Sequence, residues 1–176
     1  MKNLFLLSLL TIGLFTACKD REPDPNVLPQ ATQSGKNTAG ALVDGKVWVA
    51  TTEFVYPPGT VCENFGNKTK IVLDLRKIKN MGRNSIDIKI IIENLELNKT
   101  YELNQNPVSD FNYAIYTNNE GISYSTQLTS DYTGKIKITR IDLQNQIVSG
   151  TFEFKAIDHN GNVVNITDGR FDKKFD

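Results

Sequence analysis

The sequence predicts an all-β protein built from antiparallel strands. Apolar and polar residues alternate with a period of two in the chain after Thr38, most clearly over residues 86–93, where every second residue is isoleucine. Short clusters of Asn, Asp and Gly separate these alternating stretches, as turns between strands do. No stretch after residue 17 has an apolar face at helical spacing.

The first 17 residues have the layout of a secretory signal peptide. Lys2 precedes an apolar run over residues 4–15, and two small residues stand directly before Cys18. The run is too short to span a membrane, which takes about 20 apolar residues. Residues 14–18 resemble the bacterial lipobox, whose cysteine is diacylated and becomes the N-terminus after cleavage. The sequence therefore predicts a lipid anchor on Cys18; the alternative is an ordinary secreted protein in which Cys18 is removed or pairs with Cys62.

Residues 18–38 are predicted to form the lipidated cysteine and a flexible tether. Three prolines stand there among Asp, Asn, Gln, Ser and Thr, with almost no apolar residues to bury. Residues 19–22, a lysine followed by acidic residues and an arginine, resemble the export signal that some Bacteroidetes lipoproteins use to reach the cell surface. We expect a protein anchored by lipid in the outer membrane, on its periplasmic or its cell-surface side.

Residues 39–176 are predicted to be one all-β domain of about ten strands. Asp44-Gly45 between apolar residues predicts a two-residue hairpin, since a type I′ turn needs positive φ at both central positions. Residues 80–82, 118–121, 143–145 and 158–161 are the other turn candidates. The alternation shifts phase across Ser149-Gly150, which predicts a β-bulge and a bend. An antiparallel sandwich is favoured, with a meander barrel as the alternative closure.

Two ends of the chain carry a family resemblance. Residues 28–38 with the following Gly40-Ala41-Leu42-Val43-Asp44-Gly45-Lys46-Val47-Trp48 at one end, and Ser149-Gly150-Thr151-Phe152-Glu153-Phe154 with Ile166-Thr167-Asp168-Gly169-Arg170-Phe171-Asp172 at the other, resemble a family of uncharacterised Bacteroidetes exported lipoproteins. The resemblance covers residues 28–172. It implies an exported all-β domain and brings no known activity. It also singles out Trp48, Asp168 and Arg170 as structural motif residues.

The same resemblance bears on Cys62. Relatives tend to have an aromatic residue where Ala39 stands and a cysteine where Ala41 stands, so a disulfide between that position and the segment around Cys62 is expected to be absent. An odd cysteine in an exported protein is either buried and inert or reactive. We favour a buried, inert thiol, because free cysteine packs as a small apolar side chain and no histidine is near in the sequence.

Composition and charge exclude several functions. The chain has 20 Lys and Arg against 20 Asp and Glu, and no basic block that could bind nucleic acid. With one histidine and one thiol in the folded part, the usual zinc ligands are missing. We therefore expect no metal, no cofactor and no nucleic-acid partner.

The sequence contains no recognisable catalytic motif, and we expect no enzyme. His159 is the only imidazole and belongs to Asp-His-Asn-Gly, a typical turn. The oxygen ligands around Asp158 resemble part of a calcium loop but lack its bidentate glutamate, so a turn is favoured there too. The alternative is a carbohydrate-active hydrolase with two paired carboxylates, whose separation is a property of the folded chain.

Residues 111–132 are the most suggestive stretch for ligand binding. Tyr113, Tyr116, Tyr124 and Tyr132 stand among Asn and Ser, and tyrosines with amide neighbours suit a glycan or a protein partner. The alternative is that tyrosine simply favours strands. Tyr113 and Tyr116 differ by three positions, so a regular strand would point them to opposite faces. For Asp168-Gly169-Arg170, a strand-end turn with a structural arginine is favoured over an anion site.

These observations together predict a lipid-anchored β-domain of the cell envelope. Its role is expected to be binding or structural, with a glycan or an envelope protein as the partner and the membrane contacted through the lipid anchor.

Overall fold

The computed structural model describes residues 24–51, 59–79, 82–103, 112–131 and 133–175. The predicted signal peptide, Cys18 and Tyr132 lie outside these residues. All regular structure in the described part of the chain is β-strand, so the all-β prediction is confirmed. The strands are β1 (Thr38–Val43), β2 (Lys46–Val49), β3 (Thr60–Phe65), β4 (Lys68–Lys79), β5 (Gly82–Glu93), β6 (Thr100–Leu103), β7 (Tyr113–Thr117), β8 (Ser123–Ser125), β9 (Gly134–Asp142), β10 (Ile147–Ile157) and β11 (Val163–Lys174).

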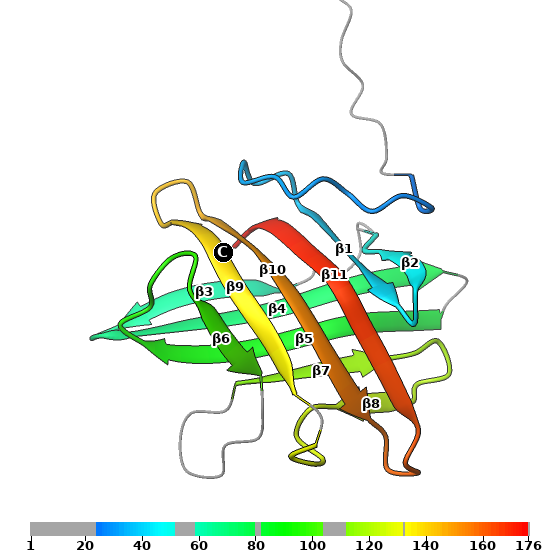
Figure 1. Cartoon of the computed structure of the whole chain (residues 1–176). Helices are drawn as coiled ribbons and strands as arrows, with labels where there is room; N and C mark the ends of the chain where they lie inside the picture. The colour runs from blue at the N-terminus through cyan, green and yellow to red at the C-terminus, as the bar shows by residue number, and fades with distance from the viewer. Residues whose placement is uncertain (1–23, 52–58, 80–81, 104–111, 132, 176) are drawn as a thin grey trace, which may run out of the picture.

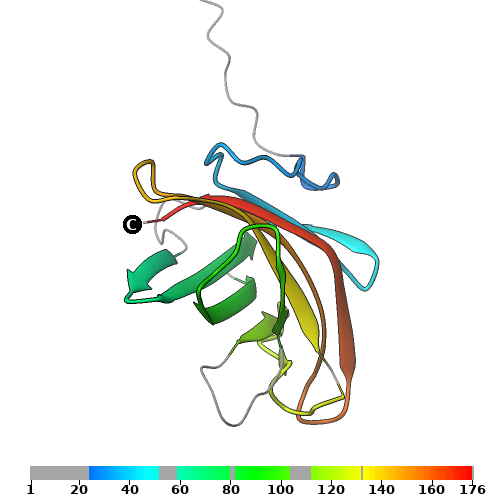
Figure 2. The same ribbon diagram turned by 60° about the vertical axis from the view of Figure 1, so that its left-hand side comes forward.

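The eleven strands form one antiparallel sheet that curls over itself into two packed layers (Figure 1). In the first layer the strand order is β2-β1-β11-β10-β9-β6, and in the second it is β8-β7-β5-β4-β3. The layers are joined where Ile157 of β10 pairs with Ser125 of β8. Figure 2 shows the first layer arching over the second, as in a half-open barrel. The fold therefore combines the two packed faces of the predicted sandwich with the continuous sheet of the alternative barrel.

Alternation of side chains explains the long hairpin of β4 and β5. Leu73 pairs with Ile88 on the face turned to the other layer, while Asp74 pairs with Asp87 on the opposite face. The predicted hairpin between β1 and β2 also forms, because Asp44 and Gly45 adopt φ values of 47° and 75°. Positive φ at both positions is what a type I′ turn requires.

The core fills the space between the two layers. Isoleucines and leucines of β4 and β5 meet phenylalanines of β10 and β11 there, in a single buried cluster. The rings of Phe152 and Phe171 lie 6.4 Å apart between their centroids. Phe171 also packs against Gly150, where a Cβ would lie 2.7 Å from its ring. The pairing of β10 with β9 shifts between Ser149 and Gly150, which confirms the predicted bulge.

The N-terminal residues 24–37 lie across the edge of the first layer, and we call them the strap (Figure 1). Sequence composition predicts a flexible tether over residues 18–38, and in the structure residues 32–37 of this segment are hydrogen-bonded to β11. One carboxylate on β11, that of Asp172, accepts hydrogen bonds from Thr32 and from three backbone amides of the strap. The strap needs few apolar residues because its attachment is polar.

No helix in the described residues is long and apolar enough to cross a bilayer.

Candidate functional site

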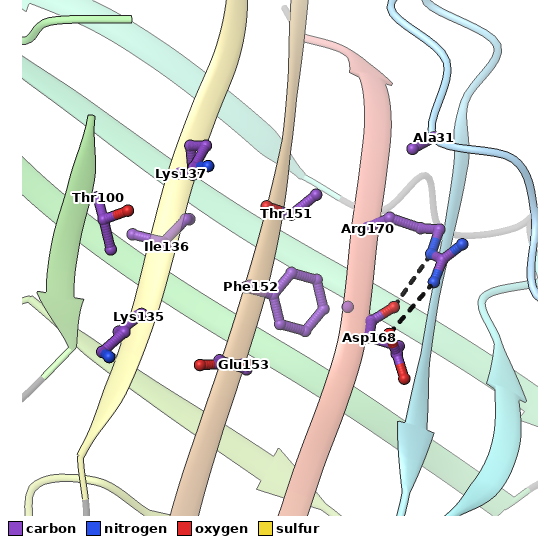
Figure 3. Close-up of a pocket in the computed structure, with 11 residues that line it drawn as sticks. Ala31, Thr100, Lys135, Ile136, Lys137, Thr151, Phe152, Glu153, Asp168 and Arg170 are labelled. Atoms are coloured by element: carbon purple, nitrogen blue, oxygen red, sulfur yellow. Dashed lines mark hydrogen bonds and ion pairs between the residues drawn. The ribbon is translucent and has the colours of Figure 1, made fainter. Parts of the chain in front are cut away.

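A polar groove lies on the solvent face of the first layer, across β9, β10 and β11 (Figure 3). We call it the outer groove. Its main hollow has a volume of about 450 Å³, and a second hollow of about 330 Å³ adjoins it by sharing Lys135 and Glu153. The residues that line the main hollow are Ala31, Thr100, Lys135, Ile136, Lys137, Thr151, Phe152, Glu153, Asp168, Gly169 and Arg170.

Strand alternation decides which side chains face the outer groove. Lys135 and Lys137 on β9 are exposed, whereas Ile136 between them is buried in the core. Thr151 and Glu153 on β10 are exposed in the same way. The groove therefore offers ammonium, hydroxyl and carboxylate groups over an apolar layer that solvent does not reach.

Strand register arranges these groups in two rows across the sheet. One row runs Thr100, Lys137, Thr151, Arg170, from β6 to β11. The next row runs Glu102, Lys135, Glu153. Lys135 thus has a carboxylate on each neighbouring strand, and Lys137 has a threonine on each.

A bulge in β11 shapes the side of the groove that is nearest to the strap. Asp168 adopts a φ of 52°, and the pairing of β10 with β11 shifts between Phe152 and Phe154. The Arg170 Nε donates to the Asp168 carbonyl at 3.0 Å, and its guanidinium lies 3.9 Å from the Asp168 carboxylate (Figure 3). The expectation of a strand-end turn at residues 168–170 is therefore wrong, since these residues lie inside β11 and Asp168 is the residue that bulges out.

The strap borders the groove, and its position depends on Asp172. The buried Asp172 carboxylate accepts hydrogen bonds from the Thr32 hydroxyl at 2.6 Å, from the amides of Ser34, Gly35 and Lys36 at 3.0, 2.8 and 3.2 Å, and from the Ser149 hydroxyl at 2.8 Å. Burial raises the pKa of Asp172, but these hydrogen bonds outweigh it and hold the pKa at about 2. Asp172 is therefore ionised at neutral pH. It holds the strap, which includes Ala31, at the border of the groove.

Lys173 supports the same attachment from the other face of β11. Its buried ammonium donates to the Asn37 carbonyl at 3.3 Å, and the Lys174 amide donates to the Asn37 side chain at 2.9 Å. Burial lowers the pKa of Lys173. Three consecutive residues of β11 thus hold the start of β1 and the strap.

A comparison with protein-family models finds one described as a domain of unknown function, DUF6252, which matches residues 80–173. This segment is 94 of the 176 residues, more than half of the chain. The chain belongs to the DUF6252 family. No curated protein matches, and neither does any solved structure.

The DUF6252 segment contains every residue that lines the outer groove except Ala31. It also contains the residues 149–154 and 166–172 on which the sequence resemblance partly depended, and the family is an uncharacterised one, as expected. Each residue of Gly169-Arg170-Phe171-Asp172 has a place in the fold. Gly169 leaves room for Phe152, Arg170 binds the bulge, Phe171 fills the core and Asp172 holds the strap.

The predicted tyrosines do not form one platform in this DUF6252 protein. Tyr116 is buried, and its hydroxyl accepts a hydrogen bond from Asn84 at 3.0 Å. Tyr124 packs beside it with ring centroids 6.0 Å apart. Tyr113 lies on the opposite face of β7, paired with Lys89. Tyr132 is outside the described residues, and none of the other three lines the outer groove.

Trp48 joins the two layers of the fold. The buried indole on β2 donates to the Asn84 side chain on β5 at 2.9 Å, and Asn84 donates in turn to Tyr116. Burial raises the pKa of Tyr116. Trp48 therefore has a structural role, and its hydrogen-bonded partners lie far from it in the sequence.

Cys62 is a free, buried thiol on β3. Burial, and to a lesser extent the charge of Glu63, raises its pKa to about 11. Ala41, where the family resemblance places a cysteine, belongs to the same core cluster as Cys62.

The remaining candidates at the turns are structural. The Asp158 carboxylate accepts hydrogen bonds from the Asn160 amide and from the amide and side chain of Asn162, at 2.8 Å each. These bonds lower the pKa of Asp158 and close the turn that holds His159. In the part of the chain that the structure describes, no three His, Cys, Asp or Glu side chains gather where they could hold a metal ion.

Sequence reasoning missed Lys135, Lys137, Thr151 and Glu153. Alternation predicts that they are exposed, but the same pattern describes any solvated strand face. Only the register with β6 and β11, and the strap along one side, turns this face into a groove.

Proposed function

We propose that this chain is a lipid-anchored binding module of the cell envelope that holds a saccharide in the outer groove. The observation that carries the proposal is the groove itself. Three neighbouring strands present charged and hydroxyl groups there, between Thr100 on one side and Ala31 of the strap on the other. Hydroxyl-rich ligands are recognised by such groups, because each sugar hydroxyl both donates and accepts hydrogen bonds.

The lining favours a saccharide over a protein partner. Protein interfaces centre on apolar and aromatic side chains that become fully buried. In the main hollow of the outer groove the large apolar residues, Ile136 and Phe152, are already buried, at 1% and 3% exposure. What remains for a ligand comes mainly from charged and hydroxyl-bearing side chains.

Binding of polysaccharides by the full chain tests this proposal. A panel of neutral and acidic polysaccharides, including those of the bacterial envelope, is presented to the wild-type chain and to Thr151→Trp, which fills the groove floor. Ser123→Trp on β8, in the second layer, is the matched control. We expect binding by the wild type and the control and its loss in Thr151→Trp. Absence of binding to the whole panel, or equal binding by Thr151→Trp, would overturn the proposal.

The anchor part of the proposal rests on Cys18 and the segment before it. Two or more acyl chains hold a protein at a bilayer almost permanently. In a bacterial host that processes lipoproteins, a fatty-acid label should enter the chain and disappear in Cys18→Ala. A labelled Cys18→Ala chain, or an unlabelled wild type, would exclude the anchor.

One observation favours hydrolysis as a second candidate. Glu153 and Asp168 are carboxylates of adjacent strands that line the same hollow, and glycoside hydrolysis uses a carboxylate pair about 5–10 Å apart. New reducing ends from a bound polysaccharide, lost in Glu153→Gln, would establish it. Binding without new reducing ends would exclude hydrolysis and support the binding module.

A further inference from the structure

We infer that the ligand of the outer groove is an acidic saccharide whose carboxylate or sulfate group contacts Lys137. This inference rests on the proposed saccharide binding and adds the charge of the ligand and its orientation. It depends on the way strand register separates the charges of the groove into two rows.

The row that contains Lys137 is cationic. From β6 to β11 it runs Thr100, Lys137, Thr151, Arg170, with two positive and no negative side chains. Neighbouring strands lie about 4.8 Å apart, so the backbones at Lys137 and Arg170 are about 10 Å apart with Thr151 between them. A ligand anion at Lys137 therefore has threonine hydroxyls on both sides and no carboxylate opposite it on β6 or β10.

Lys137 has its ammonium group available for such a ligand. It takes part in no hydrogen bond or ion pair with any residue that the structure describes, and it is exposed on the groove face. A charge-assisted hydrogen bond from an ammonium to a carboxylate or sulfate is about twice as strong as a neutral one. Arg170, by contrast, is engaged by the carbonyl and carboxylate of Asp168.

The row that contains Lys135 has the opposite character. Glu102 and Glu153 flank Lys135 on the two neighbouring strands, so this row has one positive and two negative side chains. An anion placed there meets repulsion from both carboxylates, whereas sugar hydroxyls can donate to them. The two rows thus orient the ligand, with its acidic group at Lys137 and its hydroxyls towards Glu153 and Asp168.

Matched polysaccharides and matched lysine variants test the inference with the full chain. Polygalacturonate is compared with its methyl ester, and chondroitin sulfate with its desulfated, carboxyl-reduced form, so that each pair shares a sugar backbone and differs in its acidic groups. Lys137→Gln is compared with Lys46→Gln, which removes an exposed lysine on β2 that does not line the outer groove.

We expect the wild type to bind at least one acidic polysaccharide about tenfold or more tightly than its neutral partner, with Lys137→Gln removing that preference. Lys46→Gln should keep it, and added salt should weaken acidic binding, because the site is exposed. Equal loss of acidic binding in both lysine variants would indicate a diffuse charge effect and overturn the Lys137 assignment. Groove binding that is equal for acidic and neutral partners would overturn the inference while leaving the proposed saccharide binding intact.

Discussion

Asp172 is a single carboxylate that attaches the strap to β11 through hydrogen bonds. Five hydrogen bonds converge on it from residues far apart in the sequence. Its side chain is buried, so removal of the charge weakens its hydrogen bonds to three backbone amides of the strap. The residue therefore controls both the stability of the first layer and the border of the outer groove.

Asp172→Asn should destabilise the protein by about 3 kcal/mol at pH 7, since hydrogen bonds to a charged group contribute more than neutral ones. Because the folded pKa of about 2 lies below the ordinary value near 3.9, the wild type gains about 2 to 3 kcal/mol from this group above pH 5. That contribution is lost as the pH falls from about 4 towards 2.

Urea unfolding of both chains between pH 7 and pH 3 measures this difference. The gap between wild type and Asp172→Asn should narrow as the pH falls. Asp131→Asn is the control, since Asp131 lies exposed in a turn and its carboxylate makes no hydrogen bond or ion pair with any residue that the structure describes. A gap that stays constant with pH would contradict the role assigned to the Asp172 charge.

Cys62 is the other residue whose environment makes a direct prediction. With a pKa raised to about 11, only a very small fraction of the thiol is ionised at pH 7.5, and the side chain is 6% exposed. In a chain that carries Cys18→Ser, so that Cys62 is the only thiol, labelling by a disulfide reagent should be slow. Denaturant should accelerate it at least 100-fold. Rapid, complete labelling of the folded protein would show that the thiol is reactive.

At the scale of strands, glycines on the core face of the first layer decide where aromatic rings can pack. Gly169 lies opposite Phe152, and a Cβ there would come within 2.5 Å of two ring carbons and of the Phe152 carbonyl oxygen. The glycine is required by this close approach to a neighbouring strand rather than by its own φ.

Gly169→Ala should therefore cost about 1 to 3 kcal/mol of unfolding free energy, as overpacking of a core usually does. Gly59→Ala is the matched control, because a Cβ at Gly59 meets nothing within 4 Å and its φ is not positive. The control should change stability by no more than about 0.5 kcal/mol. Thermal or urea unfolding of both variants decides the matter, and a Gly169→Ala chain as stable as the control would refute the packing argument.

Elements with a strong local pattern were predictable from the sequence. The isoleucines of β5 alternate because one face is buried, the Asp44-Gly45 turn needs positive φ, and the bulge at Gly150 interrupts an otherwise regular alternation. Asp168-Gly169 has the same residue types as a turn, so its place as a bulge inside β11 is visible only from the pairing with β10.

Elements that depend on distant partners were not predictable. The strap has the composition of a tether, and the acceptor of its amides is about 136 residues further along the chain. The outer groove depends on the register of β9 with β6 and β10, which alternation alone does not fix. For this reason the sequence pointed to the tyrosines of β7 and β8, whose chemistry is visible in one stretch, and not to Lys137.

At the scale of the whole molecule, the two layers are expected to unfold together. They share one core cluster, they are joined through β10 and β8, and Trp48 of the first layer is hydrogen-bonded to Asn84 of the second. Separating the layers would expose the apolar inner faces of both at once, so neither layer has a stable state of its own. One cooperative transition follows from this arrangement.

Trp48 is the only tryptophan, and it is 3% exposed at the contact between the layers, so its fluorescence reports their separation. Urea unfolding followed by tryptophan fluorescence and by far-ultraviolet circular dichroism should give the same midpoint. Asp172→Asn should move both midpoints down together, although Asp172 is distant in sequence from Trp48, because the strap and the layer contact belong to one cooperative unit. Midpoints that separate in the wild type, or a variant in which only one of them moves, would show that the layers unfold independently.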